Sequence, residues 1–223
     1  MDLADVARRL ESRYGAPGPS PTRDPFETIL YEQIAYLATD ERRAAAFEAL
    51  RTRVGLAPAR ILAARPALLR EVAALGGIHA AERAERMRAS ARLVLEECAG
   101  DLGAHLATLD LRAQLKLLRR FPMVGEPGAE KVLLFAGLAA LPALESNGLR
   151  VLARYWLGGE REYAATYRAV RARIASEGAN YDAPALVRAH NLVRRHGQTV
   201  CRRNAPACPA CPLAPECAFR QAS

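Results

Sequence analysis

The sequence predicts an all-α fold, and three observations support this prediction. Apolar residues recur at spacings of three and four along most of the 223-residue chain, which is the period of an amphipathic helix. Glycine or proline separates many of these segments from the next. No segment of convincing length alternates apolar and polar residues as a half-buried strand would. With 51% hydrophobic residues, the chain can bury a substantial core.

The N-terminal quarter of the chain predicts three helices and one linker. A short amphipathic helix is expected over residues 5–14, followed by a Pro/Gly-rich linker over 15–22. A largely apolar helix over 26–38 is expected near the centre of the core. Thr39 has the position of a helix N-cap, because the helix predicted over 40–54 begins with acidic residues and continues with arginines.

The rest of the chain continues the same pattern, which gives about ten or eleven helices in all. Cys98 lies inside one of these segments, apart from the other cysteines, and is expected to be a buried thiol. The remaining predicted helices cover residues 58–62, 66–74, 80–98, 111–120, 127–136, 147–157, 163–177 and 183–196.

The chain is strongly basic, with a formal net charge of +8 and a pI near 9.7. Its basic residues are 30 arginines and two lysines, Lys116 and Lys131. This charge favours a polyanionic partner, because phosphate binding releases counterions, although a general preference for arginine would also produce it. The chain shows neither a signal-peptide core nor an uncharged apolar run of 18 residues, so we expect a cytoplasmic protein with no membrane span.

Four cysteines with the spacing C-x6-C-x2-C-x5-C lie within the last 23 residues. Four thiolates in so short a loop can hold a metal centre, and in a cytosolic protein they indicate metal before disulfide. The spacing alone is compatible with an iron–sulfur cluster and with Zn²⁺. Arginines in the same stretch, including Arg202 and Arg203, suit a loop that binds phosphate. The cysteines are Cys201, Cys208, Cys211 and Cys217.

Residues 121–137 predict a helix, a tight glycine turn and a second helix. Gly125 can adopt a positive φ, and Pro127 suits the first turn of the second helix, where its missing N–H has no consequence. A helix N-terminus beside such a turn presents free amides to a phosphate. A plain corner between two helices would show the same pattern.

This hairpin, followed about 70 residues later by the cysteine spacing, resembles the endonuclease III branch of the helix-hairpin-helix DNA glycosylases. The resemblance covers essentially the whole chain. Residues 25–27 and 38–40 resemble the family's early helix, and residues 77–79 resemble the loop that supplies its wedge residue. His196 and Gly197 resemble the family's entry to its cluster loop.

The resemblance implies two all-α lobes flanking a cleft that binds double-stranded DNA. A six-helix barrel with the helix-hairpin-helix would span 25–140, and an iron–sulfur cluster domain would combine 1–24 with 141–223. It also implies a [4Fe–4S] cluster held by the four C-terminal cysteines. The cluster would fix the shape of the loop so that Arg202 and Arg203 meet the DNA backbone.

The chain departs from the family pattern at both catalytic positions. Pro127 stands where lyase members have a lysine, and a proline cannot attack C1′ of a sugar or form a Schiff base. Lys131, one helical turn further on, could substitute or could simply contact solvent or phosphate. Glu145 takes the place of the family's essential aspartate, with one more methylene. It could work in a reshaped pocket, or it could only cap the following helix.

Residues expected to contact DNA also differ from the family pattern. Leu37 replaces a glutamine that fills the gap left by the flipped base, which predicts weaker dependence on the opposite base. Ile78 replaces the wedge leucine and is still able to part a base step. Either residue could instead be part of the core. Met123 replaces the first glycine of the hairpin and fits there only if its φ stays negative, so the turn is expected to be distorted or re-formed around Gly125 and Gly128. The remaining hairpin contacts are expected at Val124, Gly125 and Gly128.

These observations predict a monomeric, nucleoid-associated protein of base excision repair. Its expected activity is that of a monofunctional DNA N-glycosylase, which removes a damaged or mismatched base and leaves an abasic site. A DNA-binding relative that has lost the chemistry is the main alternative. An iron–sulfur electron carrier is a weaker one, because it gives the basic charge and the hairpin no function.

Overall fold

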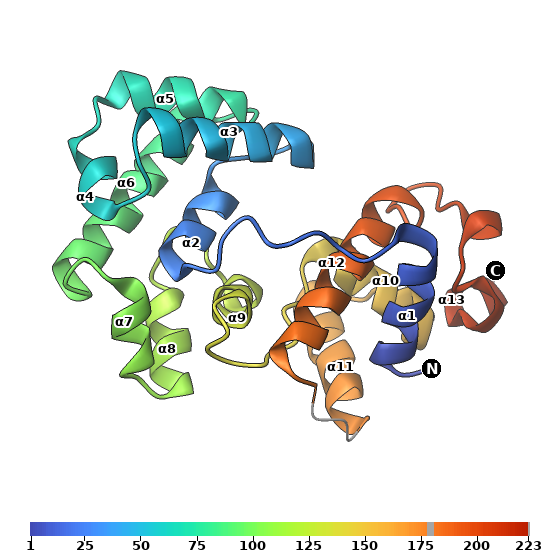
Figure 1. The fold of residues 1–223 in the computed structure, drawn as a ribbon. Coiled ribbons are helices and arrows are strands. Elements are labelled where there is room, and N and C mark those ends of the chain that lie inside the picture. The colour runs from blue at the N-terminus through green and yellow to red at the C-terminus, as the bar shows by residue number, and fades with distance from the viewer. Residues whose placement is uncertain (178–180, 223) are drawn as a thin grey trace. The chain divides into compact units, whose positions relative to one another are not determined.

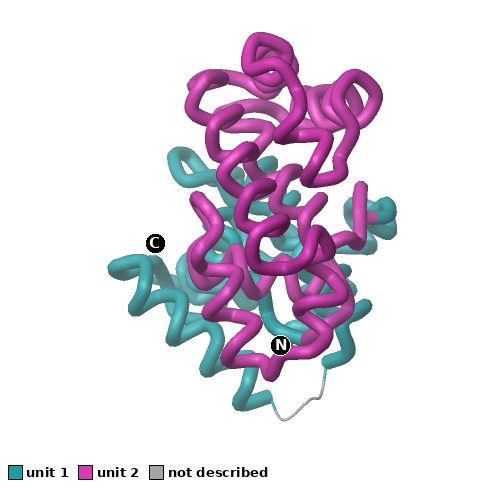
Figure 2. The backbone as a smooth tube through the Cα atoms, turned by 90° about the vertical axis from the view of Figure 1, so that its left-hand side faces the viewer, with its two compact units in different colours: residues 1–19, 140–223 teal, residues 20–139 magenta. Residues whose placement is uncertain are grey.

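The computed structural model describes residues 1–177 and 181–222, and this part of the chain contains helices and no named strand. The predicted all-α fold is therefore confirmed. The chain divides into two compact units, coloured in Figure 2: unit 1 comprises 1–19 with 140–223, and unit 2 comprises 20–139. Within the described residues, no helix is both long and apolar enough to cross a membrane.

Unit 2 is organised around its longest helix, α6, which packs against α2, α4 and α5 (Figure 1). Helix α2 also contacts α9 and α7, and α3 lies beside α5. The helices of unit 2 are α2 (Pro25–Gln33), α3 (Asp40–Arg53), α4 (Pro58–Ala63), α5 (Pro66–Leu75), α6 (Ala80–Glu97), α7 (Leu102–Ala107), α8 (Leu111–Leu118) and α9 (Glu126–Phe135).

Local sequence explains where most of these helices begin. Side chains of Asp24, Thr39, Asp101 and Asp110 accept hydrogen bonds from the first free amides of α2, α3, α7 and α8. Helices α2, α4, α5 and α9 have a proline in their first turn, where no N–H is needed. The predicted helix 26–38 is too long, since α2 ends at Gln33, and α7 was not predicted.

Unit 1 is organised around α10, which packs against α11, α12 and α13, while α1 packs on α12. Two glycines allow α10 and α12 to approach closely. A Cβ on Gly197 would lie 2.5 Å from the carbonyl oxygen of Asn147, and one on Gly148 would lie 2.8 Å from Val193 Cγ2. The helices of unit 1 are α1 (Leu3–Tyr14), α10 (Ser146–Leu157), α11 (Tyr163–Ser176), α12 (Ala183–Thr199) and α13 (Ala218–Gln221), with 3₁₀ turns η1 (Cys208–Ala210) and η2 (Ala214–Glu216).

Candidate functional site

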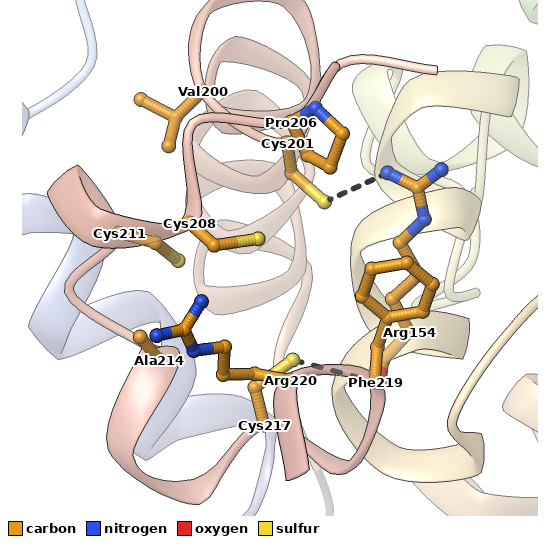
Figure 3. A pocket seen from close by; sticks show the side chains of 10 residues that line it. All are labelled: Arg154, Val200, Cys201, Pro206, Cys208, Cys211, Ala214, Cys217, Phe219 and Arg220. Carbon is orange, nitrogen blue, oxygen red and sulfur yellow. Dashed lines mark hydrogen bonds between the residues drawn. The ribbon is translucent and has the colours of Figure 1, made fainter. Parts of the chain in front are cut away.

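The four C-terminal cysteines line one pocket at the end of α12 (Figure 3). The loop begins as α12 ends, where the Cys201 N–H donates to the His196 carbonyl over 2.9 Å. Turns η1 and η2 then bring Cys208, Cys211 and Cys217 to the same pocket. All four are partly buried free thiols. The structure thus places together the residues that the sequence grouped by spacing.

The thiols surround this pocket without meeting at one point (Figure 3). Among the described residues, no three His, Cys, Asp or Glu side chains form a group that could hold a single metal ion. Four thiols around one pocket are a donor set that suits an iron–sulfur cluster and also Zn²⁺.

Two arginines of α10 fix the start of the cysteine loop. Arg150 donates from Nε to the Cys201 carbonyl over 2.9 Å and from Nη2 to the Gly197 carbonyl over 2.8 Å. Arg154 donates from Nη1 to the Arg202 carbonyl over 2.8 Å and from Nη2 to the Arg203 carbonyl over 3.0 Å. Because both guanidinium groups are buried, these bonds order the loop backbone and bring positive charge to the thiols.

The pocket is a desolvated environment for sulfur. Burial raises the pKa of the Cys201 and Cys211 thiols above the ordinary value. The Arg154 guanidinium opposes this at Cys201, where its Nη1 lies 3.6 Å from the sulfur. A buried thiolate needs positive charge beside it, and Arg154 supplies such a charge at Cys201.

His196 is fully buried and lies beside one of these thiols. Its Nε2 is 3.3 Å from Cys211 Sγ, and its Nδ1 is 2.9 Å from the Tyr14 hydroxyl. Burial, with a smaller contribution from the charge of Arg13, lowers the pKa of His196 to about 4.

Glu145 is the N-cap of α10. Its Oε1 accepts the Gly148 N–H over 2.6 Å, and its Oε2 accepts a bond from Asn147 Nδ2 over 2.9 Å. The capping interpretation is thus correct for this side chain. Two hydrogen bonds also fix the direction of the carboxylate, and each oxygen keeps a lone pair for a further partner.

Lys131 is engaged in a structural ion pair within unit 2. Its Nζ lies 2.8 Å from Glu32 Oε1 and 5.4 Å from the centre of the Phe135 ring. The same Glu32 carboxylate also faces Arg43. The side chain is mostly buried among these partners, which does not suit an amine that must attack a substrate.

The hairpin differs from expectation at two residues. Met123, predicted to need a negative φ, adopts φ +64 with a side chain that is 71% exposed. Gly125, which as a glycine could take a positive φ, has φ −82 and ψ −172 and serves as the N-cap of α9. Sequence rules failed here because neighbours decide the turn: buried Gln33 donates from Nε2 to the Pro122 carbonyl over 2.8 Å.

Leu37 and Ile78 are brought together by a short parallel bridge. The bridge joins Tyr36 to Gly77, and in it the Tyr36 N–H donates to the Gly76 carbonyl over 3.0 Å. Leu37 follows Tyr36 and Ile78 follows Gly77, and their side chains are 76% and 50% exposed. The alternative that they form part of the core is excluded. Gly76 permits the bridge, because a Cβ there would lie 2.0 Å from the Ile34 carbonyl oxygen.

A buried arginine fixes this pair of loops. Arg83 donates from Nε to the Ile78 carbonyl and from Nη2 to the Gly77 carbonyl, each over 2.8 Å, and from Nη1 to the Ile34 carbonyl. The guanidinium therefore ties both loops to α6. Two left-handed residues, Leu37 at φ +49 and His79 at φ +58, complete the local geometry.

Sequence reasoning did not find several residues that shape these sites. Arg202 and Arg203 have exposed side chains, as a phosphate-binding function requires. The loop itself is fixed through their backbone carbonyls, which accept hydrogen bonds from Arg154. Arg150 and Arg154 could have been suspected, because two arginines four residues apart interrupt an otherwise apolar helix. The contacts of Tyr14 and Arg83 leave no comparable signal in the sequence.

Comparison with known proteins identifies the fold. No protein-family model matches the chain, and no curated protein sequence matches it significantly. Among solved structures, a thermostable thymine-DNA glycosylase matches with 16% identity and a TM-score of 0.76, over 99% of this chain and 98% of that one. A trapped endonuclease III–DNA covalent intermediate matches with 17% identity and a TM-score of 0.74, over 100% and 98%.

A third solved structure is similar over most of the chain. The 3-methyladenine DNA glycosylase of H. pylori, bound to 1,N6-ethenoadenine, matches with 15% identity and a TM-score of 0.67, over 89% of this chain and 98% of that one. The chain thus has the all-α fold of the helix-hairpin-helix DNA glycosylases, as the sequence predicted. At these identities the likeness establishes the fold alone.

Proposed function

We propose that this chain is a monofunctional DNA N-glycosylase of the endonuclease III type, which removes a damaged or mismatched base from double-stranded DNA. The observation that carries the proposal is a likeness over almost the whole chain to solved proteins named as DNA glycosylases. Endonuclease III in the matching structures is bound to DNA. The net charge of +8 fits a polyanionic substrate.

Exposed apolar loops of unit 2 support contact with a DNA duplex. Leu37, Ile78 and Met123 are among its most exposed large apolar side chains. Each lies on a loop that buried Arg83 or Gln33 ties to the helices. Rigidly presented apolar side chains can enter a base step, which helps to extrude a nucleotide. We propose this function for these three residues, with Val124, Gly125 and Gly128 forming the hairpin beside Met123.

The cysteine loop supports a structural iron–sulfur centre. The four thiols suit a [4Fe–4S] cluster, because they line one pocket and follow the cysteine spacing of the family that the chain resembles. When bound, the cluster would supply a rigid, charge-balanced centre for the loop. Arg202 and Arg203 would then present exposed guanidinium groups to backbone phosphates.

Glu145 is the proposed catalytic residue. As the N-glycosidic bond breaks, its electron pair leaves with the base and positive charge develops at C1′ of the sugar. An oriented carboxylate can stabilise that charge or accept a proton from the water that attacks C1′. The hydrogen bonds from Gly148 and Asn147 supply the orientation. Pro127 supplies no amine and Lys131 is ion-paired, so we propose no lysine-dependent lyase step.

A panel of lesion-containing oligonucleotides tests the proposal through base loss. Glu145→Gln should lower the excision rate by about 100-fold or more, since a general base typically contributes that much. Glu145→Asp keeps the carboxylate and should retain most activity. Glu162→Gln is the matched control, because Glu162 caps α11 in the same unit. It should lose a little stability at the start of α11 and keep its excision rate.

A second function is favoured by one specific observation, namely that Glu145 is already satisfied as a helix cap. A non-catalytic DNA-binding protein would show no base loss with any lesion, tight binding to the same oligonucleotides and no effect of Glu145→Gln on that binding. Borohydride reduction on an abasic oligonucleotide separately tests the lyase prediction. A covalent adduct that disappears in Lys131→Ala would overturn it.

A further inference from the structure

The imidazole of His196 connects α1 to the cysteine pocket. It is fully buried, with Nδ1 2.9 Å from the Tyr14 hydroxyl and Nε2 3.3 Å from Cys211 Sγ. Two of the other thiols have different polar neighbours: Cys201 faces an Arg154 guanidinium nitrogen, and Cys217 lies 3.7 Å from the Arg154 carbonyl. Cys211 is therefore the thiol with an imidazole partner in the described part of the chain.

The direction of these hydrogen bonds follows from the chemistry of a metal-bound thiolate. A ligating sulfur can only accept, so the imidazole must carry an N–H on Nε2. In a neutral imidazole Nδ1 is then the acceptor, and the Tyr14 hydroxyl donates to it. The Tyr14 hydroxyl thus selects the tautomer that points an N–H at the sulfur.

Tyr14 is itself held in place by α12. The Arg195 guanidinium lies 4.8 Å from the centre of the Tyr14 ring, and its Nη1 donates to the Tyr14 carbonyl over 3.1 Å. Thr199 Oγ1 lies 3.2 Å from the Tyr14 hydroxyl. Since Thr199 Oγ1 donates to the Arg195 carbonyl over 2.8 Å, it leaves the Tyr14 proton available for His196.

We propose that His196 is a positioning residue for the metal centre: it donates Nε2–H to Cys211 Sγ, Tyr14 fixes its tautomer, and together they raise the reduction potential and slow the loss of iron. The inference rests on the proposed iron–sulfur centre. A donor to a ligating sulfur stabilises the more negative, reduced form of a cluster, so its removal lowers the potential. Outer ligands of this kind typically change metal affinity by 10- to 100-fold.

The test compares anaerobically purified wild-type protein with His196→Leu, His196→Gln and Tyr14→Phe. The readouts are iron content, a redox titration followed by visible and electron paramagnetic resonance spectra, and the rate of iron loss to a chelator. At the wild-type midpoint, His196→Leu should show a reduced-to-oxidised ratio about tenfold lower, which is 59 mV for one electron. Iron loss should be about tenfold faster or more.

The other variants separate hydrogen bonding from packing. His196→Gln restores an N–H donor and should recover much of both effects, whereas Tyr14→Phe keeps the ring and should show an intermediate shift. Tyr181→Phe removes another hydroxyl of unit 1, bonded to Glu177, and should match wild type. If His196→Leu does not fold, Tyr14→Phe carries the test alone.

Two negative outcomes are distinguishable. Iron-loaded wild type with unchanged potential and iron loss in Tyr14→Phe and the foldable His196 variants would overturn the inference and leave the proposed function intact. Iron-free wild type after anaerobic reconstitution would overturn the cluster together with the inference. Base excision measured on the same preparation decides the glycosylase proposal separately.

Discussion

Met123 combines a left-handed backbone with an exposed apolar side chain. Its φ is +64 and its side chain is 71% exposed. The left-handed backbone costs a non-glycine residue roughly 1–2 kcal/mol. The exposure of a large apolar side chain to water is also unfavourable in the isolated protein. Such a residue is best explained by a partner that covers the side chain, and the proposed partner is a base step of DNA.

Replacing Met123 with glycine should therefore separate stability from binding. Met123→Gly should raise the free energy of unfolding by about 1 kcal/mol, because glycine adopts positive φ without strain. It should weaken DNA binding about tenfold, because a buried methionine contributes roughly 1.5–3 kcal/mol. Denaturant titration and fluorescence anisotropy measure the two effects.

Ala99 provides the matched control for Met123. It has φ +49 and is exposed at the end of α6, outside the proposed DNA loops. Ala99→Gly should gain similar stability and keep wild-type DNA affinity. Equal DNA affinity of the two variants would show that the Met123 side chain does not contact DNA.

Single residues show where sequence reasoning succeeds and where it stops. Cys98 was predicted to be buried and is 2% exposed, because an isolated cysteine without metal-ligand spacing behaves as a small apolar side chain. The exchange of roles between Met123 and Gly125 could not be predicted. A turn rule assigns positive φ to glycine, but the neighbouring Pro122 is held by Gln33, 89 residues away in the chain.

At the scale of elements, α10 concentrates the functional features of unit 1. Its N-cap is Glu145, Gly148 permits close contact with α12, and Arg150 and Arg154 fix the cysteine loop. Both arginines lie on the face that packs toward the loop, because they are four residues apart. One helix thus links the proposed catalytic carboxylate to the proposed metal centre.

The contact between α10 and α12 gives a prediction on stability. Gly197→Ala should lower the free energy of unfolding by roughly 1–3 kcal/mol, because the new Cβ would lie 2.5 Å from the Asn147 carbonyl oxygen. Gly159→Ala, with nothing within 4 Å of the added Cβ, should be nearly neutral. Urea unfolding monitored by circular dichroism distinguishes the two, and equal stability of the variants would refute the close contact.

Element boundaries follow from local sequence only where local bonds set them. The predicted helix over 40–54 matches α3 at Asp40–Arg53, because Thr39 caps it. The helix over 26–38 was predicted too long, because Tyr36 bonds to Gly76 and leaves the helical path. Helix α7 was missed, because it has six residues and includes Gly103. Hydrophobic periodicity along the sequence cannot predict long-range hydrogen bonds such as that from Arg83 to the Ile34 carbonyl.

For the whole molecule, charge is distributed unevenly between the units. Unit 1 has 15 basic and nine acidic side chains, a net +6, whereas unit 2 has 17 and 15, a net +2. The excess in unit 1 includes Arg202 and Arg203 on the cysteine loop. Phosphate binding is therefore expected to depend mainly on unit 1, and base recognition on the loops of unit 2.

The salt dependence of DNA binding tests this division. Arg202→Ala with Arg203→Ala should reduce the slope of log K against log salt by about 1.8, since each phosphate contact contributes about 0.9. The control pair Arg112→Ala with Arg168→Ala removes two exposed charges elsewhere and should leave the slope nearly unchanged. Anisotropy titrations from 50 to 200 mM salt measure the slopes, and equal slopes for both pairs would exclude a specific contact.

The cysteine loop has a small apolar core of its own. Within the described residues 200–222, the buried apolar side chains are Val200 and Leu213. The Arg154 guanidinium bonds to the start of the loop and lies 4.9 Å from the centre of the Phe219 ring near its end. Arg9 forms an ion pair with Glu216. The proposed metal centre would order the residues between these contacts.

Removal of the proposed metal centre should act locally. Hydrogen exchange in the loop 201–217 should approach that of an unfolded chain after anaerobic iron chelation, while amides of α2 to α9 keep their protection. DNA affinity should fall as it does in the Arg202 and Arg203 variant, because the same guanidinium groups lose their placement. Cys208→Ser provides a second route to the same state. Unchanged exchange in the loop after loss of iron would show that the protein alone determines its conformation.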